Sequence, residues 1–92
     1  MTEEKKQMIK TVKNKLWRFG YSVNDFSLTA HIDFDLLIEN NLRVNVESIG
    51  VKEIPETCDV VAVVRSEAVT FFSKQDGKVV SNKSPYKVFG RK

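Results

Sequence analysis

Three of the four carboxylates in two neighbouring segments of alternating polar and apolar residues could do chemistry together. Asp33 and Asp35 belong to segment 31–39, and Glu47 closes a second alternating segment, 42–47. Carboxylate oxygens suit Mg²⁺ or Mn²⁺, which usually hold one or two protein carboxylates together with waters and substrate phosphates. Such a metal ion can generate hydroxide for phosphodiester hydrolysis. The same pattern is typical of a half-exposed hairpin whose acids face water, so both interpretations stay open.

The two segments predict a hairpin over residues 31–49. Directly opposed residues of an antiparallel pair share a face. The apolar positions therefore match in two registers: a five-residue loop would place Asp35 opposite Glu47, and a three-residue loop places Leu36 opposite Val44. In that register the three carboxylates converge on one face of the hairpin, and Asp33 lies opposite Glu47. The sequence thus predicts Mg²⁺ or Mn²⁺ as the one candidate cofactor, with all three acids as candidate ligands.

A second candidate site belongs to segment 3–19, whose apolar residues recur at helical spacing. At about 100° per residue, Lys6, Lys10, Lys13 and Trp17 fall on the side opposite the apolar stripe. Lysines contact phosphates without sequence preference, and an exposed aromatic ring can stack on a base or pack against a protein partner. The alternative is that Trp17 only covers the stems of neighbouring lysines.

Charge is distributed unevenly along the 92 residues, although the formal net charge is only +3. Residues 1–20 carry a net charge of +4, residues 21–73 of −6 and residues 74–92 of +5. Basic segments attract polyanions, so Lys87 and Arg91 join the helix lysines as candidate nucleic-acid contacts. Simple solvation of the basic ends is the alternative interpretation.

The chain length and the pattern of helix and strand segments predict a single α+β domain over residues 1–92. We expect an N-terminal helix, 3–19, packed on a small, mostly antiparallel sheet of four to five strands. After the hairpin, apolar runs predict strands at 58–64 and 68–73. The basic C-terminal tail, 81–92, is expected to be loose or only partly strand-like.

The connection over residues 50–57 contains Pro55 and reads as irregular. Parallel pairing of two strands needs a crossover of about a dozen residues, usually with a helix. The short connection therefore argues against parallel pairing between the hairpin and the strand that follows it.

Composition excludes several classes of protein. With 41% apolar and 10% aromatic residues, the chain can bury a core and is not intrinsically disordered. No apolar run approaches the roughly 20 residues needed to span a bilayer, so no membrane association is predicted. Cys58 is the single cysteine and His31 the single histidine, which excludes a His/Cys zinc cluster. A lone cysteine is typical of a reducing cytoplasm, the predicted location.

The order of a helix, Asp35-Leu-Leu-Ile, a turn and Arg43-Val-Asn-Val-Glu47 resembles the core of the PD-(D/E)XK nuclease superfamily. The resemblance covers about residues 4–73 and is strongest to Holliday-junction resolvases and restriction-type endonucleases. It implies a restriction-endonuclease-like core with Asp35 and Glu47 as catalytic residues of a Mg²⁺- or Mn²⁺-dependent endonuclease. Ile49 stands where the motif has its lysine, so the resemblance implies a reduced, catalytically degenerate member.

These observations favour a small nucleic-acid-associated protein that binds DNA or RNA through its lysine-rich helix and tail. One alternative is an active metal-dependent nuclease. Another is a protein-interaction or inhibitor module, or a homodimer, that uses exposed strand edges together with Tyr86 and Phe89 of the tail.

Overall fold

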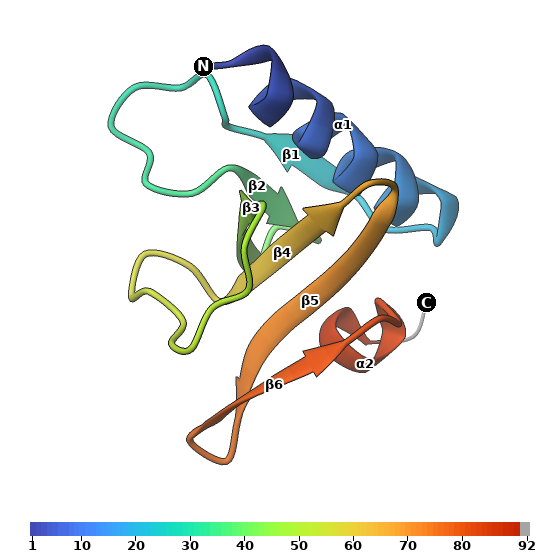
Figure 1. Ribbon diagram of the computed structural model, residues 1–92, viewed down its shortest axis with the longest axis vertical. Coiled ribbons are helices and arrows are strands. Elements are labelled where there is room, and N and C mark those ends of the chain that lie inside the picture. The colour runs from blue at the N-terminus through green and yellow to red at the C-terminus, as the bar shows by residue number, and fades with distance from the viewer. Residues whose placement is uncertain (91–92) are drawn as a thin grey trace.

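In the computed structural model, which describes residues 1–90, a long N-terminal helix packs on a six-stranded sheet (Figure 1). The strands lie in the order β1-β2-β3-β4-β5-β6, and every neighbouring pair is antiparallel except β3 and β4. The elements run in chain order over α1 (Glu3–Arg18), β1 (Val23–Asp25), β2 (Leu36–Ile38), β3 (Leu42–Glu47), β4 (Val60–Arg65), β5 (Ala68–Gln75), β6 (Lys78–Asn82) and α2 (Tyr86–Phe89). The predicted class, a helix on a small, mostly antiparallel sheet, is confirmed, with one strand more than expected.

Local signals fix both ends of α1. The Thr2 hydroxyl accepts a hydrogen bond from the Lys5 backbone N–H at 3.1 Å, which satisfies one of the amides that a helix start leaves unpaired. Gly20 follows the helix with a φ of +90°, a conformation that side chains disfavour. The stripe of Ile9, Val12 and Leu16 is buried against the sheet. This stripe decides which of the helix lysines face outward.

The β2–β3 hairpin has the predicted register, with Leu36 opposite Val44 and a three-residue loop. The expected strand over residues 31–35, however, is wrong. Phe34 packs against the cluster on the sheet face away from the helices, whereas Leu36 belongs to the cluster under α1. The chain therefore bends between these two residues, and His31 has a φ of 68°.

Strands β3 and β4 pair in parallel, so the expectation against parallel pairing is wrong. The twelve residues 48–59 span the connection without a helix. An ion pair fixes the strand starts beside each other: the Asp59 carboxylate accepts hydrogen bonds from the backbone N–H, Nε and Nη2 of Arg43 at 2.9–3.1 Å. The Asp59 N–H in turn donates to the Arg43 carbonyl at 2.9 Å. These four bonds supply local order where a crossover helix is missing.

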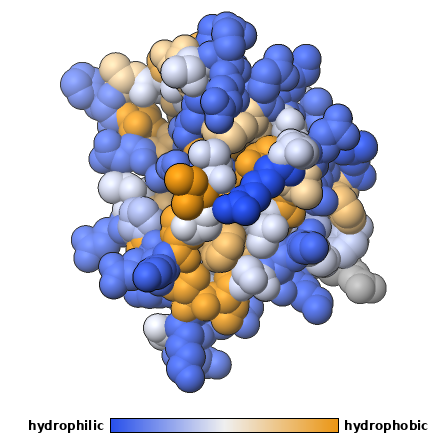
Figure 2. All heavy atoms as spheres, viewed as in Figure 1, coloured by the Kyte–Doolittle hydropathy of each residue, from blue (hydrophilic) through white to orange (hydrophobic). Residues whose placement is uncertain are grey.

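Residues of β4 face two different layers of the core. Val60, Ala62 and Val64 lie in the cluster under α1 and α2. Val61 and Val63 lie in a smaller cluster that also contains parts of the connection 48–59. The strand is thus buried on both sides, as its unbroken apolar run predicts. Figure 2 shows apolar side chains gathered over β4 and β5, with hydrophilic side chains around them.

The C-terminal tail is more ordered than expected. Its first residues belong to β6, which follows an Asp76-Gly77 turn with both φ values positive. Residues 86–89 then form α2. The ring of Tyr86 lies 5.1 Å from that of Phe19, and the Tyr21 hydroxyl donates to the Gly90 carbonyl. Aromatic packing therefore holds residues up to 90 on the sheet. Neither α1 nor α2, the helices of the described residues, is long and apolar enough to cross a membrane.

Candidate functional site

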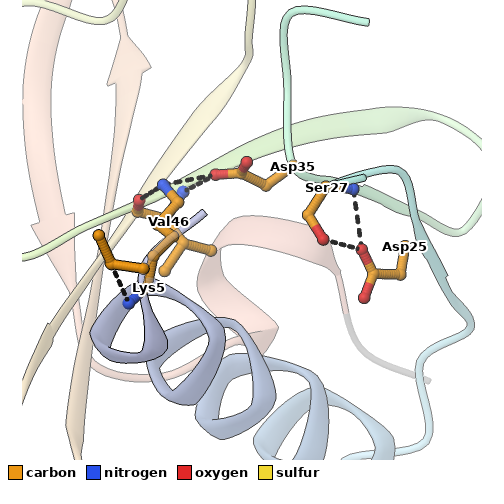
Figure 3. A network of polar contacts seen from close by, with 6 residues as sticks. Lys5, Asp25, Ser27, Asp35 and Val46 are labelled. Carbon is orange, nitrogen blue, oxygen red and sulfur yellow. Dashed lines mark hydrogen bonds and ion pairs between the residues drawn. The ribbon is translucent and has the colours of Figure 1, made fainter. Parts of the chain in front are cut away.

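Asp35 is engaged by contacts within the fold. Its Oδ2 atom accepts a hydrogen bond from the Val46 N–H at 2.8 Å and lies 3.0 Å from the Lys5 Nζ atom. The Lys5 ammonium also donates to the Val46 carbonyl. Val46 lies two residues beyond the last β3 residue that pairs with β2, so these side chains satisfy the backbone groups that β2 leaves unpaired. Figure 3 shows this contact between α1 and the hairpin.

Sequence reasoning missed Lys5, although a signal for it was present. Lys5 precedes Ile9 by four residues and Val12 by seven, so it continues the apolar stripe of α1 toward the N-terminus. A lysine in that position points at the sheet, and only 26% of its side chain is exposed. Its partner Asp35 is 18% exposed. A lysine at the helical spacing of an apolar stripe thus indicates that a partly buried acid lies opposite it.

The other two predicted metal ligands, Asp33 and Glu47, do not join Asp35. Asp33 is exposed and lines an open hollow next to His31 and Arg43, while Glu47 is exposed at the end of β3. Within residues 1–90 no group of three or more His, Cys, Asp or Glu side chains is arranged to hold a metal ion. The expected convergence of the three carboxylates therefore does not occur. The physical reason is the bend after Phe34, which ends the pairing at Leu36 before Asp33 can face Glu47.

Two further residues of chemically reactive types, Asp59 and Cys58, have structural surroundings. Hydrogen bonds from the Arg43 side chain hold the pKa of Asp59 below its ordinary value, against the opposing effect of burial. Burial is the main cause that raises the pKa of the Cys58 thiol. Cys58 is therefore protonated at neutral pH and buried, which is the opposite of a nucleophilic cysteine.

The outer face of α1 is open, as its helical phase predicts. Lys6 and Lys10 are exposed, and Trp17 is 50% exposed. Lys13 is half-buried: its Nζ atom lies 3.0 Å from Asp25 Oδ2 and 5.3 Å from the centre of the Trp17 ring. The structure thus brings the four residues predicted for this site to one face.

Asp25 holds Lys13 in place because it is itself fixed. The Ser27 N–H and hydroxyl both donate to Asp25 Oδ1, at 2.9 and 2.6 Å (Figure 3). Burial alone would raise the pKa of Asp25, but the hydrogen bonds from Ser27 and Lys13 outweigh it and the pKa is lowered. Asp25 is therefore ionised at neutral pH, which keeps Lys13 beside Trp17.

A hollow of about 320 Å³ lies between the outer face of α1 and the chain that follows β1. We call it the α1 groove. Its main lining residues are Lys6, Ile9, Lys10, Lys13, Trp17 and Leu28. Leu28, which is 80% exposed, was missed by sequence reasoning. The signal for it is a large apolar residue inside an otherwise polar turn.

The basic C-terminal residues lie elsewhere. Lys87 is exposed on α2 and lines a separate hollow of about 470 Å³, together with Lys74 and the Arg43–Asp59 pair. This hollow and the α1 groove share no lining residue. Arg91 lies outside the described residues.

The chain matches no protein-family model, no curated protein and no solved structure.

Proposed function

We propose that this chain is a small nucleic-acid-binding protein that contacts phosphates through the outer face of α1. One observation carries the proposal: Lys6 and Lys10 line the same groove as a half-exposed tryptophan and have little to bind within the fold. Lys10 makes no ion pair among residues 1–90, and Lys6 makes only a 3.4 Å pair with Glu3, whose side chain is 84% exposed.

Exposed lysines of this kind are suited to polyanions. Their ammonium groups are hydrated and weakly paired, so a phosphate can bind without first breaking an internal contact. Binding releases counterions condensed on the nucleic acid, and this release supplies affinity without sequence preference. The α1 face thus favours a sequence-independent binder.

The proposal assigns no catalytic role to Asp35 or Glu47. A metal ion at Asp35 Oδ2 would have to displace the Lys5 ammonium and compete with the Val46 N–H for that oxygen. Lys87, with Lys74 beside it, would contribute at most a second and weaker contact, because it lies in a different hollow.

The test is a binding titration with a fluorescein-labelled 20-nucleotide dT strand at several salt concentrations. The double variant Lys6→Gln/Lys10→Gln removes two phosphate contacts. We expect roughly twentyfold weaker binding near 0.1 M salt, and a logarithmic salt slope smaller by about 1.4.

The matched control is Lys52→Gln/Lys78→Gln, which removes the same charge from two exposed positions away from the groove. It should change affinity only slightly. Equal weakening by the two double variants would mean that net charge, and not the α1 face, carries the binding. No binding by the unmodified protein would refute the proposed function.

A further inference from the structure

We propose that the α1 groove takes an unpaired base of a single-stranded nucleic acid, stacked on Trp17 and flanked by Leu28. This inference rests on the proposed function, because the lysines at the rim must hold phosphates of the same strand. It adds a substrate class, single strands over duplexes, and a stacking residue.

Exposed apolar surface is concentrated in this groove. Five large apolar side chains are exposed among residues 1–90, and three of them, Met1, Trp17 and Leu28, line the α1 groove. Ile9, which is 3% exposed, also lines it and belongs to the core. Single exposed apolar residues are ordinary, but several in one hollow indicate a binding site.

The tryptophan is prepared for stacking. Lys13 lies over the Trp17 ring and is itself tied to Asp25, which two hydrogen bonds from Ser27 hold in place. This chain of contacts restrains the indole before any ligand arrives, which lowers the entropy lost on binding. Trp17 is 50% exposed, so it can still meet a base.

The dimensions and charge of the groove favour a base of a single strand. A volume of about 320 Å³ is at the small end of ligand pockets. The bases of a duplex are covered by their neighbours, whereas an unpaired base offers its ring face to an aromatic side chain. Lys6 and Lys10 stand four residues apart on the same rim, about 6 Å between their Cβ atoms. Positive charge beside an apolar floor thus complements a strand that presents an unpaired base together with phosphates.

Trp17 is the only tryptophan of the chain, so intrinsic fluorescence reports on the groove alone. The probes are a 12-nucleotide dT strand, an abasic strand with the same number of phosphates, a 12-base-pair duplex and a 12-residue poly-glutamate peptide. We expect the dT strand to quench the fluorescence. The abasic strand should bind about tenfold more weakly or worse and leave the fluorescence unchanged.

Two variants locate the effect, with circular dichroism as the check on folding. Trp17→Leu, followed by anisotropy of the labelled strands, should weaken dT binding about tenfold and leave binding of the abasic strand unchanged. Leu28→Ser should weaken dT binding in the same direction. Ile49→Ser is its matched control, since Ile49 is 71% exposed and does not line the groove.

The experiment distinguishes failure of this inference from failure of the proposed function. If the abasic strand binds as tightly as the dT strand, stacking is overturned while phosphate binding by α1 stands. If the duplex or the poly-glutamate peptide quenches Trp17 as strongly as the dT strand, the assignment to unpaired bases is overturned. If no nucleic acid binds, the proposed function falls and this inference falls with it.

Discussion

The acidic hairpin and the outer face of α1 were both predicted as sites from their charges. In the folded protein their central charged side chains differ in exposure and in internal contacts. In the hairpin the central carboxylate, Asp35, is 18% exposed and bound to Lys5 and the Val46 N–H. On α1, Lys6 and Lys10 remain exposed on the same face as a half-exposed Trp17. The charge of Asp35 is thus used inside the fold, whereas the charges of Lys6 and Lys10 stay exposed on α1.

Two adjacent lysines show what decides between these outcomes. The side chain of Lys5 is 26% exposed and reaches Asp35 at 3.0 Å. The side chain of Lys6 is 50% exposed and reaches only Glu3 at 3.4 Å. They differ by one helical step of about 100°, which puts one over the sheet and the other over solvent. Helical phase, and not charge density, therefore separates a structural lysine from a candidate binding lysine.

The largest effect is expected when a mutation introduces a carboxylate into the sheet at a position that offers it no partner. Val63→Asp puts a charge into the cluster of Cys58 and Val61, at a position that is only 5% exposed. Burial of an unpaired charge should cost as much as the whole stability of a small domain, about 5 kcal/mol or more. We expect loss of the folded state in circular dichroism and in urea titration. Val63→Thr, similar in shape, should remain folded.

A folded Val63→Asp protein with an unchanged unfolding midpoint would show that this face of the sheet tolerates charge. The partners of Asp35 would then be no explanation for its burial.

Removal of the carboxylate that does have partners should cost less. Asp35→Ala leaves the Val46 N–H and the Lys5 ammonium without their acceptor, so we expect the free energy of unfolding to fall by about 2–3 kcal/mol. Asp35→Asn keeps an acceptor for the Val46 N–H but loses the ion pair. Its free energy of unfolding should lie between those of the unmodified protein and Asp35→Ala. Urea titration measures all three proteins.

Asp33→Ala is the control for the hairpin, because Asp33 is exposed. Its effect should stay within about 0.5 kcal/mol. Equal losses for Asp33→Ala and Asp35→Ala would contradict the structural role assigned to the Asp35 contacts.

Acid should weaken the fold through Asp59, whose carboxylate is paired with Arg43. Hydrogen bonds from Arg43 lower the folded-state pKa of Asp59 below the ordinary 3.8. As the pH falls, the unfolded chain therefore binds the proton first, and stability decreases. The contribution of ionised Asp59 to the free energy of unfolding should be complete above about pH 5. It should be lost as the pH drops through the folded-state pKa of Asp59.

Urea midpoints between pH 3 and pH 7 measure this dependence. Asp59→Asn should be less stable at pH 7 and show a flatter acid limb. Asp76→Asn, which removes a charge at an exposed turn, is the control. An acid limb as steep in Asp59→Asn as in the unmodified chain would place the acid sensitivity elsewhere.

The smallest effect is expected at the open face. Lys6→Gln/Lys10→Gln should change the free energy of unfolding by no more than about 0.5 kcal/mol, because neither lysine has a strong internal partner. Thermal and urea unfolding at low salt provide the measurement. A loss comparable with that of Asp35→Ala would mean that α1 uses these lysines to hold the fold, and the contrast between the two regions would disappear.

Local features were predictable because short-range physics decides them. The helix start at Thr2, its end before Gly20 and the pairing of Leu36 with Val44 follow from capping, backbone conformation and alternation. The outward position of Trp17 follows from helical phase in the same way. None of these features depends on a contact between distant segments.

Two of the failures involve distant segments. The parallel pairing of β3 and β4 depends on the pair of Arg43 and Asp59. The order of the tail depends on contacts of Tyr86 with Phe19. In each case both partners are visible in the sequence, but nothing local indicates that they meet.

The sequence by itself thus determined which residues carry charge and which side of α1 they occupy, because helical phase is a property of the chain alone. Only the tertiary structure decided which charges are used internally. Lys5 and Asp35 are 30 positions apart, and their contact exists because α1 packs over the end of the β2–β3 pairing. Leu28 joins Trp17 at one groove for the same reason: burial of the apolar stripe brings the surfaces together, and the polar contacts follow from that placement.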